Sequence, residues 1–225
     1  MTSYYSINPK FYVSVDCIIF GFDKGSLKLL LLKRNFEPEK GSWSLMGGFV
    51  QEGESVDKAA QRVLKELTGL ENVYMEQVGT YGEIHRDPGE RVISVAYSAL
   101  ININEYDREL VDRHNASWTD LDKIPPLVFD HQQMVEQALA WFRRKASSEP
   151  VGFELLPELF TLTQLQNLYE AIYGKRMDKR NFRKQIAMMD FIEKTDLIDK
   201  TGSKRGAALY RFNENTYRMA PKFKL

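Results

Sequence analysis

The feature that most constrains this chain is residues 48–70, where a glycine-containing loop leads into a strongly amphipathic stretch. Between Glu54 and Thr68 the apolar residues recur at intervals of three and four, which predicts a helix with one continuous buried stripe. Gly69 follows directly and predicts the end of this helix, because glycine readily adopts the left-handed conformation of a helix C-terminus. The apolar stripe consists of Val56, Ala59, Ala60, Val63, Leu64 and Leu67.

The residues around this segment predict several strands and one further long helix. Phe11–Phe22 and Leu27–Lys33 are rich in β-branched, aromatic and leucine residues, and a turn at 23–26 separates them. Residues 29–32 are four consecutive leucines, which predicts a strand buried on both faces. Further strands are expected at Tyr74–Tyr81 and Arg91–Ile103, followed by a helix that Asp130 caps and that runs to about Lys145.

A second, shorter domain is expected after the small polar stretch 146–152, so we predict domains at 1–148 and 149–225. Thr163 is expected to cap a helix that runs to about Tyr173, and Asp178 a second helix over Lys179–Met189. A hairpin pattern at 191–195 and 208–212 follows, around a turn at 199–206. Two helices followed by a two-stranded hairpin are typical of a winged helix-turn-helix module.

The charge distribution agrees with this division. The whole chain has 31 basic and 31 acidic residues, but residues 174–225 contain 14 basic and 6 acidic ones. A basic end on an otherwise acidic chain favours a sensor joined to a module that binds a polyanion. Cys17 is the single cysteine and is interpreted as a small buried residue. Without an apolar stretch of about 20 residues or a leader pattern, the sequence predicts a cytoplasmic protein with no membrane contact.

Residues 48–70 resemble the Nudix box, which reads Gly, five residues, Glu, seven residues, then Arg-Glu-aliphatic-any-Glu-Glu-any-Gly-aliphatic. The approach Trp43-Ser-Leu-Met-Gly-Gly-Phe-Val has the matching spacing. Val63 and Leu67 depart from the pattern, because they stand where the family has glutamates that help to hold Mg²⁺. Valine and leucine offer no oxygen ligand to magnesium. The positions that match are Gly48, Glu54, Arg62, Leu64, Glu66, Gly69 and Leu70.

The resemblance implies a Nudix-like α/β/α sandwich with a mixed sheet, and the two substitutions predict that its hydrolase activity is lost. We therefore expect no catalytic residue, no bound metal and no cofactor. The rival interpretation is a magnesium-dependent Nudix pyrophosphohydrolase with an accessory domain, because Glu52, Glu54 and Glu66 remain.

The whole chain resembles the Nudix-related transcriptional regulators, which join a Nudix-like domain to a winged helix. The segments 86–97 and 155–174 are similar to segments of that family. The resemblance implies a homodimer that acts on a palindromic duplex DNA operator, as a repressor or alternatively as an activator, and that responds to a small-molecule effector. One branch of the family responds to ADP-ribose or NAD metabolites and another to L-arabinose. The chain looks closer to the second branch, which predicts control of sugar catabolism by L-arabinose, with ADP-ribose as the alternative.

The candidate DNA-binding residues lie on the second helix of the winged module and on its wing. Phe182 and Ile186 are four residues apart and are expected to face the core, which leaves the polar and basic side chains outside. Such side chains read base edges or contact phosphates, although a basic helix face is often only solvated. The predicted set is Lys179, Arg180, Asn181, Arg183 and Lys184, with Lys204 and Arg205 at the wing tip.

Candidate effector-binding residues are aromatic and polar side chains at strand ends and in loops, since a sugar needs an aromatic face and polar anchors. Trp43 has core packing as an alternative role, and Arg86 and Arg91 have ion pairs with Asp87 and Glu90. The predicted set is Tyr5, Arg34, Trp43, Arg86, Asp87 and Arg91.

Overall fold

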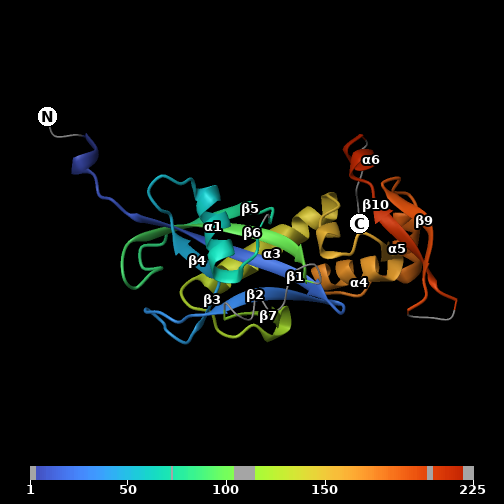
Figure 1. The fold of residues 1–225 in the computed structure, drawn as a ribbon, viewed down its shortest axis with the longest axis horizontal. Helices are drawn as coiled ribbons and strands as arrows, with labels where there is room; N and C mark the ends of the chain where they lie inside the picture. Colours follow the sequence, from blue (N-terminus) through green and yellow to red (C-terminus); the bar gives the residue numbers. More distant parts are fainter. Residues whose placement is uncertain (1–3, 72, 104–114, 202–204, 220–225) are drawn as a thin grey trace.

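The computed structural model describes residues 4–71, 73–103, 115–201 and 205–219. Its first part is a mixed sheet with helices on both faces (Figure 1). The elements of this part are η1 (Tyr4–Ile7), β1 (Tyr12–Asp23), β2 (Ser26–Lys33), β3 (Trp43–Ser44), β4 (Met46–Phe49), α1 (Val56–Thr68), β5 (Glu76–Tyr81), β6 (Val92–Asn102), β7 (Ala116–Asp120), η3 (Leu121–Lys123) and α3 (His131–Ser148).

The sheet has its longest strands at the centre. The main path runs β3-β2-β1-β6-β5, with β4 paired to β1 and β7 paired to β2. Strands β1 and β6 are parallel over eleven residue pairs, from Tyr12 with Val92 to Phe22 with Asn102, and the other pairings are antiparallel. The predicted mixed sheet of a Nudix-like domain is therefore confirmed.

Alternating residues of the central strands pack into two separate layers. Val15, Cys17 and Ile19 of β1 lie in the core beneath α1, whereas Ile18 and Phe20 lie in the core beneath α3. The four leucines 29–32 of β2 divide in the same way, which confirms a strand buried on both faces. Cys17 is fully buried, as the sequence predicted.

The second part has the order of a winged helix-turn-helix. Its elements are η4 (Phe153–Leu155), β8 (Phe160–Thr161), α4 (Leu162–Tyr173), α5 (Lys179–Ile186), β9 (Ile192–Asp199), β10 (Ala207–Phe212) and α6 (Glu214–Met219). The strands form a small sheet in the order β8-β10-β9. Its core is continuous with the end of the first sheet, because Phe22, Leu27 and Phe142 pack in the same cluster as the residues of α4 and α5.

Several local expectations need correction. Helix α4 begins at Leu162 with Thr161 as its cap, not Thr163, because Thr161 and Gln164 form a reciprocal capping box. Helix α5 ends at Ile186, three residues before the predicted Met189. Asp130 occupies the N-cap position of α3, but its side chain makes no capping hydrogen bond. The structure also has strands β3, β4 and β7, which the sequence pattern did not predict.

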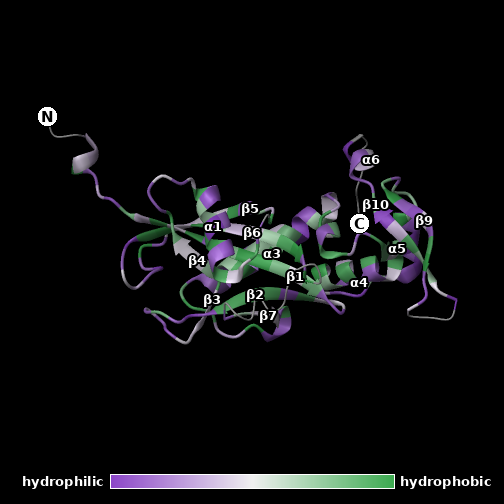
Figure 2. Ribbon diagram, in the orientation of Figure 1, coloured by the Kyte–Doolittle hydropathy of each residue, from purple (hydrophilic) through white to green (hydrophobic). Residues whose placement is uncertain are grey.

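The N-terminal segment extends away from the body of the molecule (Figure 1). Three of its apolar side chains are largely exposed: Tyr4 at 75%, Tyr5 at 80% and Ile7 at 70%. The hydropathy colours of Figure 2 show a different arrangement in the body, where apolar residues follow the inner strands and α5 is largely polar. Among the described residues, no helix has both the length and the apolar character to cross a membrane.

Candidate functional site

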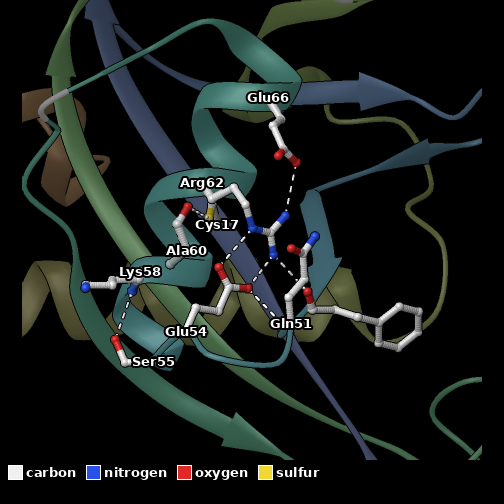
Figure 3. A network of polar contacts seen from close by, with 9 residues as sticks. Cys17, Gln51, Glu54, Ser55, Lys58, Ala60, Arg62 and Glu66 are labelled. Atoms are coloured by element: carbon white, nitrogen blue, oxygen red, sulfur yellow. Dashed lines mark hydrogen bonds and ion pairs between the residues drawn. The ribbon is translucent and has the colours of Figure 1, made fainter.

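The helix α1 and the loop before it are held together by Arg62 (Figure 3). The Arg62 guanidinium donates to Glu54 from Nε at 3.0 Å and from Nη2 at 2.6 Å, and to the Phe49 carbonyl at 2.9 Å. Its Nη1 donates to Glu66 at 3.0 Å. Hydrogen bonds from Arg62 and from the backbone of Gln51 lower the pKa of Glu54 to about 2. Arg62 and Glu54 therefore fix the loop rather than leave a free carboxylate.

The two positions that depart from the Nudix box face the core. Val63 is 2% exposed, and a Cβ built on Gly48 would lie 2.7 Å from Val63 Cγ2, so the two elements are in close contact. Leu67 is partly buried against the same core cluster. Within the described ranges, no three His, Cys, Asp or Glu residues are grouped so that they could hold a metal ion. These residues do not fit the magnesium that the family's box implies.

A cavity of about 310 Å³ opens beside the loop of the box. It lies where β1, β2 and the β3–β4 segment meet the start of α3, and both polar and aromatic side chains line it. The lining includes Ser14, Asp16, Arg34, Phe36, Glu37, Ser44, Gly47, Gly48, Arg86, Asp87, Phe129 and His131. A cavity with a few polar groups among apolar ones is typical of a small-molecule site.

The inner wall of this cavity is a buried network of charges. Arg86 is 8% exposed and donates to Asp130 from Nε at 2.8 Å and from Nη2 at 2.7 Å. Asp16 is 4% exposed, and its carboxylate lies 3.6 Å from Arg86 Nη2 and 3.4 Å from His131 Nε2. Burial opposes the charge of Arg86, but the carboxylates of Asp130 and Asp16 outweigh it and raise the pKa of Arg86.

His131 is the first residue of α3 and lines the cavity. Its Nδ1 accepts a hydrogen bond from the Leu45 backbone N–H at 3.1 Å, and its ring is 3% exposed. Burial lowers the pKa of His131 more strongly than Asp16 and Asp130 raise it. The lowered pKa favours the neutral ring, and the hydrogen bond to Leu45 connects α3 to the β3–β4 segment.

Half of the predicted effector residues meet at this cavity. Arg34, Arg86 and Asp87 line it, and the Arg34 guanidinium lies over the rings of Phe36 at 4.3 Å and Phe129 at 5.3 Å. Arg86 pairs with Asp130, not with Asp87 as the alternative interpretation suggested. Asp87 Oδ1 accepts from the Gly89 N–H, as expected of a turn.

The other three predicted effector residues do not line the cavity. Tyr5 is on the exposed N-terminal segment, and Trp43 packs partly buried against the core on the α3 side. Arg91 donates to the Glu83 carbonyl at 2.9 Å and lies over Phe11. Asp16 was missed, although the signal was present: it is the one charged residue in the apolar run 13–20.

The candidate nucleic-acid interface lies on α5, whose orientation the buried Phe182 and Ile186 fix. Asp178 caps the helix by accepting from the Asn181 N–H at 2.7 Å. The predicted residues Lys179, Arg180, Asn181, Arg183 and Lys184 are all exposed. In the described part of the chain, none of the four basic side chains forms an ion pair.

The wing is formed by β9 and β10, which pair in antiparallel fashion from Asp199 with Ala207 to Ile192 with Phe212. Arg205 is exposed at the base of the connecting turn. Lys204, the other predicted wing residue, lies outside the described residues.

These features define a class of protein: a Nudix-type α/β domain with an altered box, joined to a winged helix DNA-binding domain. A model of the NUDIX domain matches residues 10–142, and a model of the NrtR DNA-binding winged helix domain matches residues 152–212. The chain is 37% identical over 213 residues to the "ADPR responsive transcriptional repressor NtrR" of Acinetobacter baylyi, covering 93% of this chain and 85% of that relative. The chain belongs to the NrtR family of Nudix-related transcriptional regulators.

Solved structures agree with this assignment along nearly the whole chain. Shewanella oneidensis NrtR in complex with a 27-mer DNA superimposes with a TM-score of 0.82 at 32% identity, covering 95% of this chain and 97% of that one. The isolated NUDIX domain of the same protein, crystallised with ADP ribose, gives a TM-score of 0.53 at 31% identity over 63% of this chain and 99% of that one. An ADP-ribose pyrophosphatase of Methanocaldococcus jannaschii is 37% identical over 129 residues, 57% of this chain and 73% of that relative.

Proposed function

We propose that this protein is a transcriptional repressor whose binding to duplex DNA is controlled by ADP-ribose. The observation that carries the proposal is the likeness to an ADP-ribose-responsive repressor over 93% of the chain, which includes both the cavity and the winged helix. L-arabinose and a role in sugar catabolism, which the sequence favoured, find no support in the comparisons. The alternative effector, ADP-ribose, fits them better.

The chemistry of the cavity supports a nucleotide sugar as the ligand. Arg34 and Arg86 offer guanidinium groups to phosphate oxygens, and carboxylates such as Asp87 suit ribose hydroxyls. The ring of Phe129 adds an apolar face. We assign Arg34, Arg86 and Asp87 to effector binding on this ground, while the same role for Tyr5, Trp43 and Arg91 stays a prediction.

The altered box supports the loss of hydrolysis. Val63 and Leu67 place apolar groups in the core at the two positions where the family's box has glutamates. The remaining Glu54 is engaged by Arg62. The test is turnover of ADP-ribose with Mg²⁺ and with Mn²⁺ at micromolar protein, followed by release of AMP. Sustained turnover at the rate of an ordinary Nudix hydrolase would replace the proposal with the pyrophosphohydrolase alternative.

A homodimer on a palindromic operator is part of the proposal, because winged helices read two half-sites through two-fold symmetry. The exposed N-terminal segment supports a second copy as its partner. Tyr4 and Tyr5 are largely exposed, and the segment leads to Tyr12, whose ring lies 5.4 Å from that of Phe49 beside the cavity. Light scattering on the full chain and on a chain without residues 1–9 tests this: we expect a dimer that the deletion weakens.

The central test is a fluorescence polarisation titration. The DNA is a duplex that the full-length protein selects from a random library, and ADP-ribose, L-arabinose and NAD⁺ are added in separate arms. We expect ADP-ribose to weaken the DNA complex and L-arabinose to have no effect. If no duplex is selected, DNA binding is refuted; if only L-arabinose acts, the effector assignment is refuted.

A further inference from the structure

One helix joins the effector cavity to the winged helix. The helix α3 runs from His131 to Ser148, so its 18 residues span about 27 Å at 1.5 Å per residue. Figure 1 shows it passing along the sheet and ending beside the winged helix half of the molecule. Its first turn contacts the network behind the cavity, and its last turn contacts α4.

The cavity end of α3 is held by a charge pair instead of a cap. The Asp130 carboxylate stands at the N-cap position but accepts both of its hydrogen bonds from Arg86, at 2.7 and 2.8 Å. The Arg86 side chain is only 4% exposed, so separating it from Asp130 would leave the buried guanidinium with only its longer 3.6 Å contact to Asp16. A ligand that displaced Arg86 would therefore also be expected to displace the start of α3.

The far end of α3 is tied to α4 by two hydrogen bonds that run in opposite directions. Arg143 Nε donates to the Ile172 carbonyl at 2.7 Å, and the Tyr173 hydroxyl donates to the Ala146 carbonyl at 2.9 Å. Phe142 and Ala146 are fully buried in the core that includes α4 and α5. A movement of α3 along or around its axis would therefore displace the last turn of α4.

From α4 the connection continues to the recognition helix through the turn between them. The Glu170 carboxylate accepts from the Met177 N–H at 3.0 Å, and Gln166 Nε2 donates to the Met177 carbonyl at 3.0 Å. Asp178, the next residue, caps α5. Each link between the cavity and α5 is thus a specific hydrogen bond, ion pair or core contact.

We propose that α3 couples the effector cavity to the DNA-binding helix. In this proposal the Arg86–Asp130 pair transmits effector binding to the start of α3, and Arg143 and Tyr173 transmit a displacement of α3 to α4. The inference rests on the proposed function and specifies how that function is regulated. It assigns to Arg143 and Tyr173 a role in coupling without any contact to effector or DNA. The coupling is the factor by which one bound ligand changes the Kd for the other. This factor must be the same whether the Kd for DNA or the Kd for ADP-ribose is measured.

The test compares two variants with a matched control. Arg143→Met keeps the aliphatic stem and removes the donor, and Tyr173→Phe removes only the hydroxyl. Arg144→Met alters the neighbouring arginine, which is exposed and makes no ion pair with any described residue. For each protein, the Kd for a fluorescent duplex is measured with and without saturating ADP-ribose, and the Kd for ADP-ribose with and without duplex.

We expect the combined Arg143→Met and Tyr173→Phe variant to bind each ligand alone within about twofold of the wild type, while its coupling ratio falls at least threefold from the 5–150-fold usual for such systems. Arg144→Met should keep the wild-type ratio. An unchanged ratio in the combined variant, or an equal loss in Arg144→Met, would overturn the inference alone. A wild-type ratio of one would overturn the proposed function, and this inference with it.

Discussion

Replacing Val63 by glutamate restores one position of the Nudix box and tests whether that position is closed to solvent. Val63 is 2% exposed and touches Gly48, so the new carboxyl would enter the core under α1. A buried carboxyl stays protonated, because burial raises the pKa of a glutamate toward 8 or 9. Keeping it protonated at pH 7, when its unfolded pKa is about 4.3, costs about 4 kcal/mol at roughly 1.4 kcal/mol per pH unit.

The pH dependence separates this cost from simple misfit. The folded state of Val63→Glu holds a proton that the unfolded state releases, so the destabilisation grows as the pH rises. Relative to Val63→Gln, which has the same shape without the titration, the loss should be about 1 kcal/mol at pH 5 and about 4 kcal/mol at pH 7. Urea unfolding at both pH values measures it. Equal stability of the two variants at pH 7 would show that the side chain reaches water and would refute the argument that this position cannot serve a metal.

Three further outcomes follow from the described contacts. Arg180→Ala and Arg183→Ala should each weaken DNA binding. If the replaced arginine contacts a phosphate, the slope of log Kd against log salt concentration should also fall by about one. An unchanged slope would place that side chain outside the interface. Thr161→Ala should cost about 1 kcal/mol in thermal unfolding through loss of the capping box, whereas Thr163→Ala should have almost no effect. Because burial lowers the pKa of His131, stability should fall as the pH drops below about 6.5, and His131→Gln should reduce that dependence.

Much of the fold could be predicted because the sequence signals were local. The stripe of α1, the glycine at its end and the leucines of β2 each depend on near neighbours, and all three match the structure. Strand β3 was missed because it has only two residues, and β7 because it pairs with β2, a strand far away in the sequence. Thr161 rather than Thr163 caps α4 because Gln164, three residues after Thr161, completes the capping box.

The candidate site was only half predictable, for a related reason. Arg34, Arg86 and Asp87 lie in loops or at strand ends and could be proposed by residue type. What Arg86 does there depends on Asp130, 44 residues away, and sequence patterns favour the nearer Asp87 as its partner. Local propensity likewise favoured Asp130 as a helix cap, and the tertiary ion pair overrode it.

The contacts around α1 divide the Nudix box into two separable parts. Arg62 still binds Glu54 and the Phe49 carbonyl, and these contacts shape the loop that forms one edge of the cavity. Val63 and Leu67, at the positions of metal ligands, instead add apolar area to the core. The arginine network thus holds the loop in the place where it borders the cavity, and Val63 and Leu67 have no part in that network. For the repressor that we propose, this arrangement would be an advantage, because an effector that is bound without being cleaved can shift the equilibrium between the DNA-binding state and the unbound state.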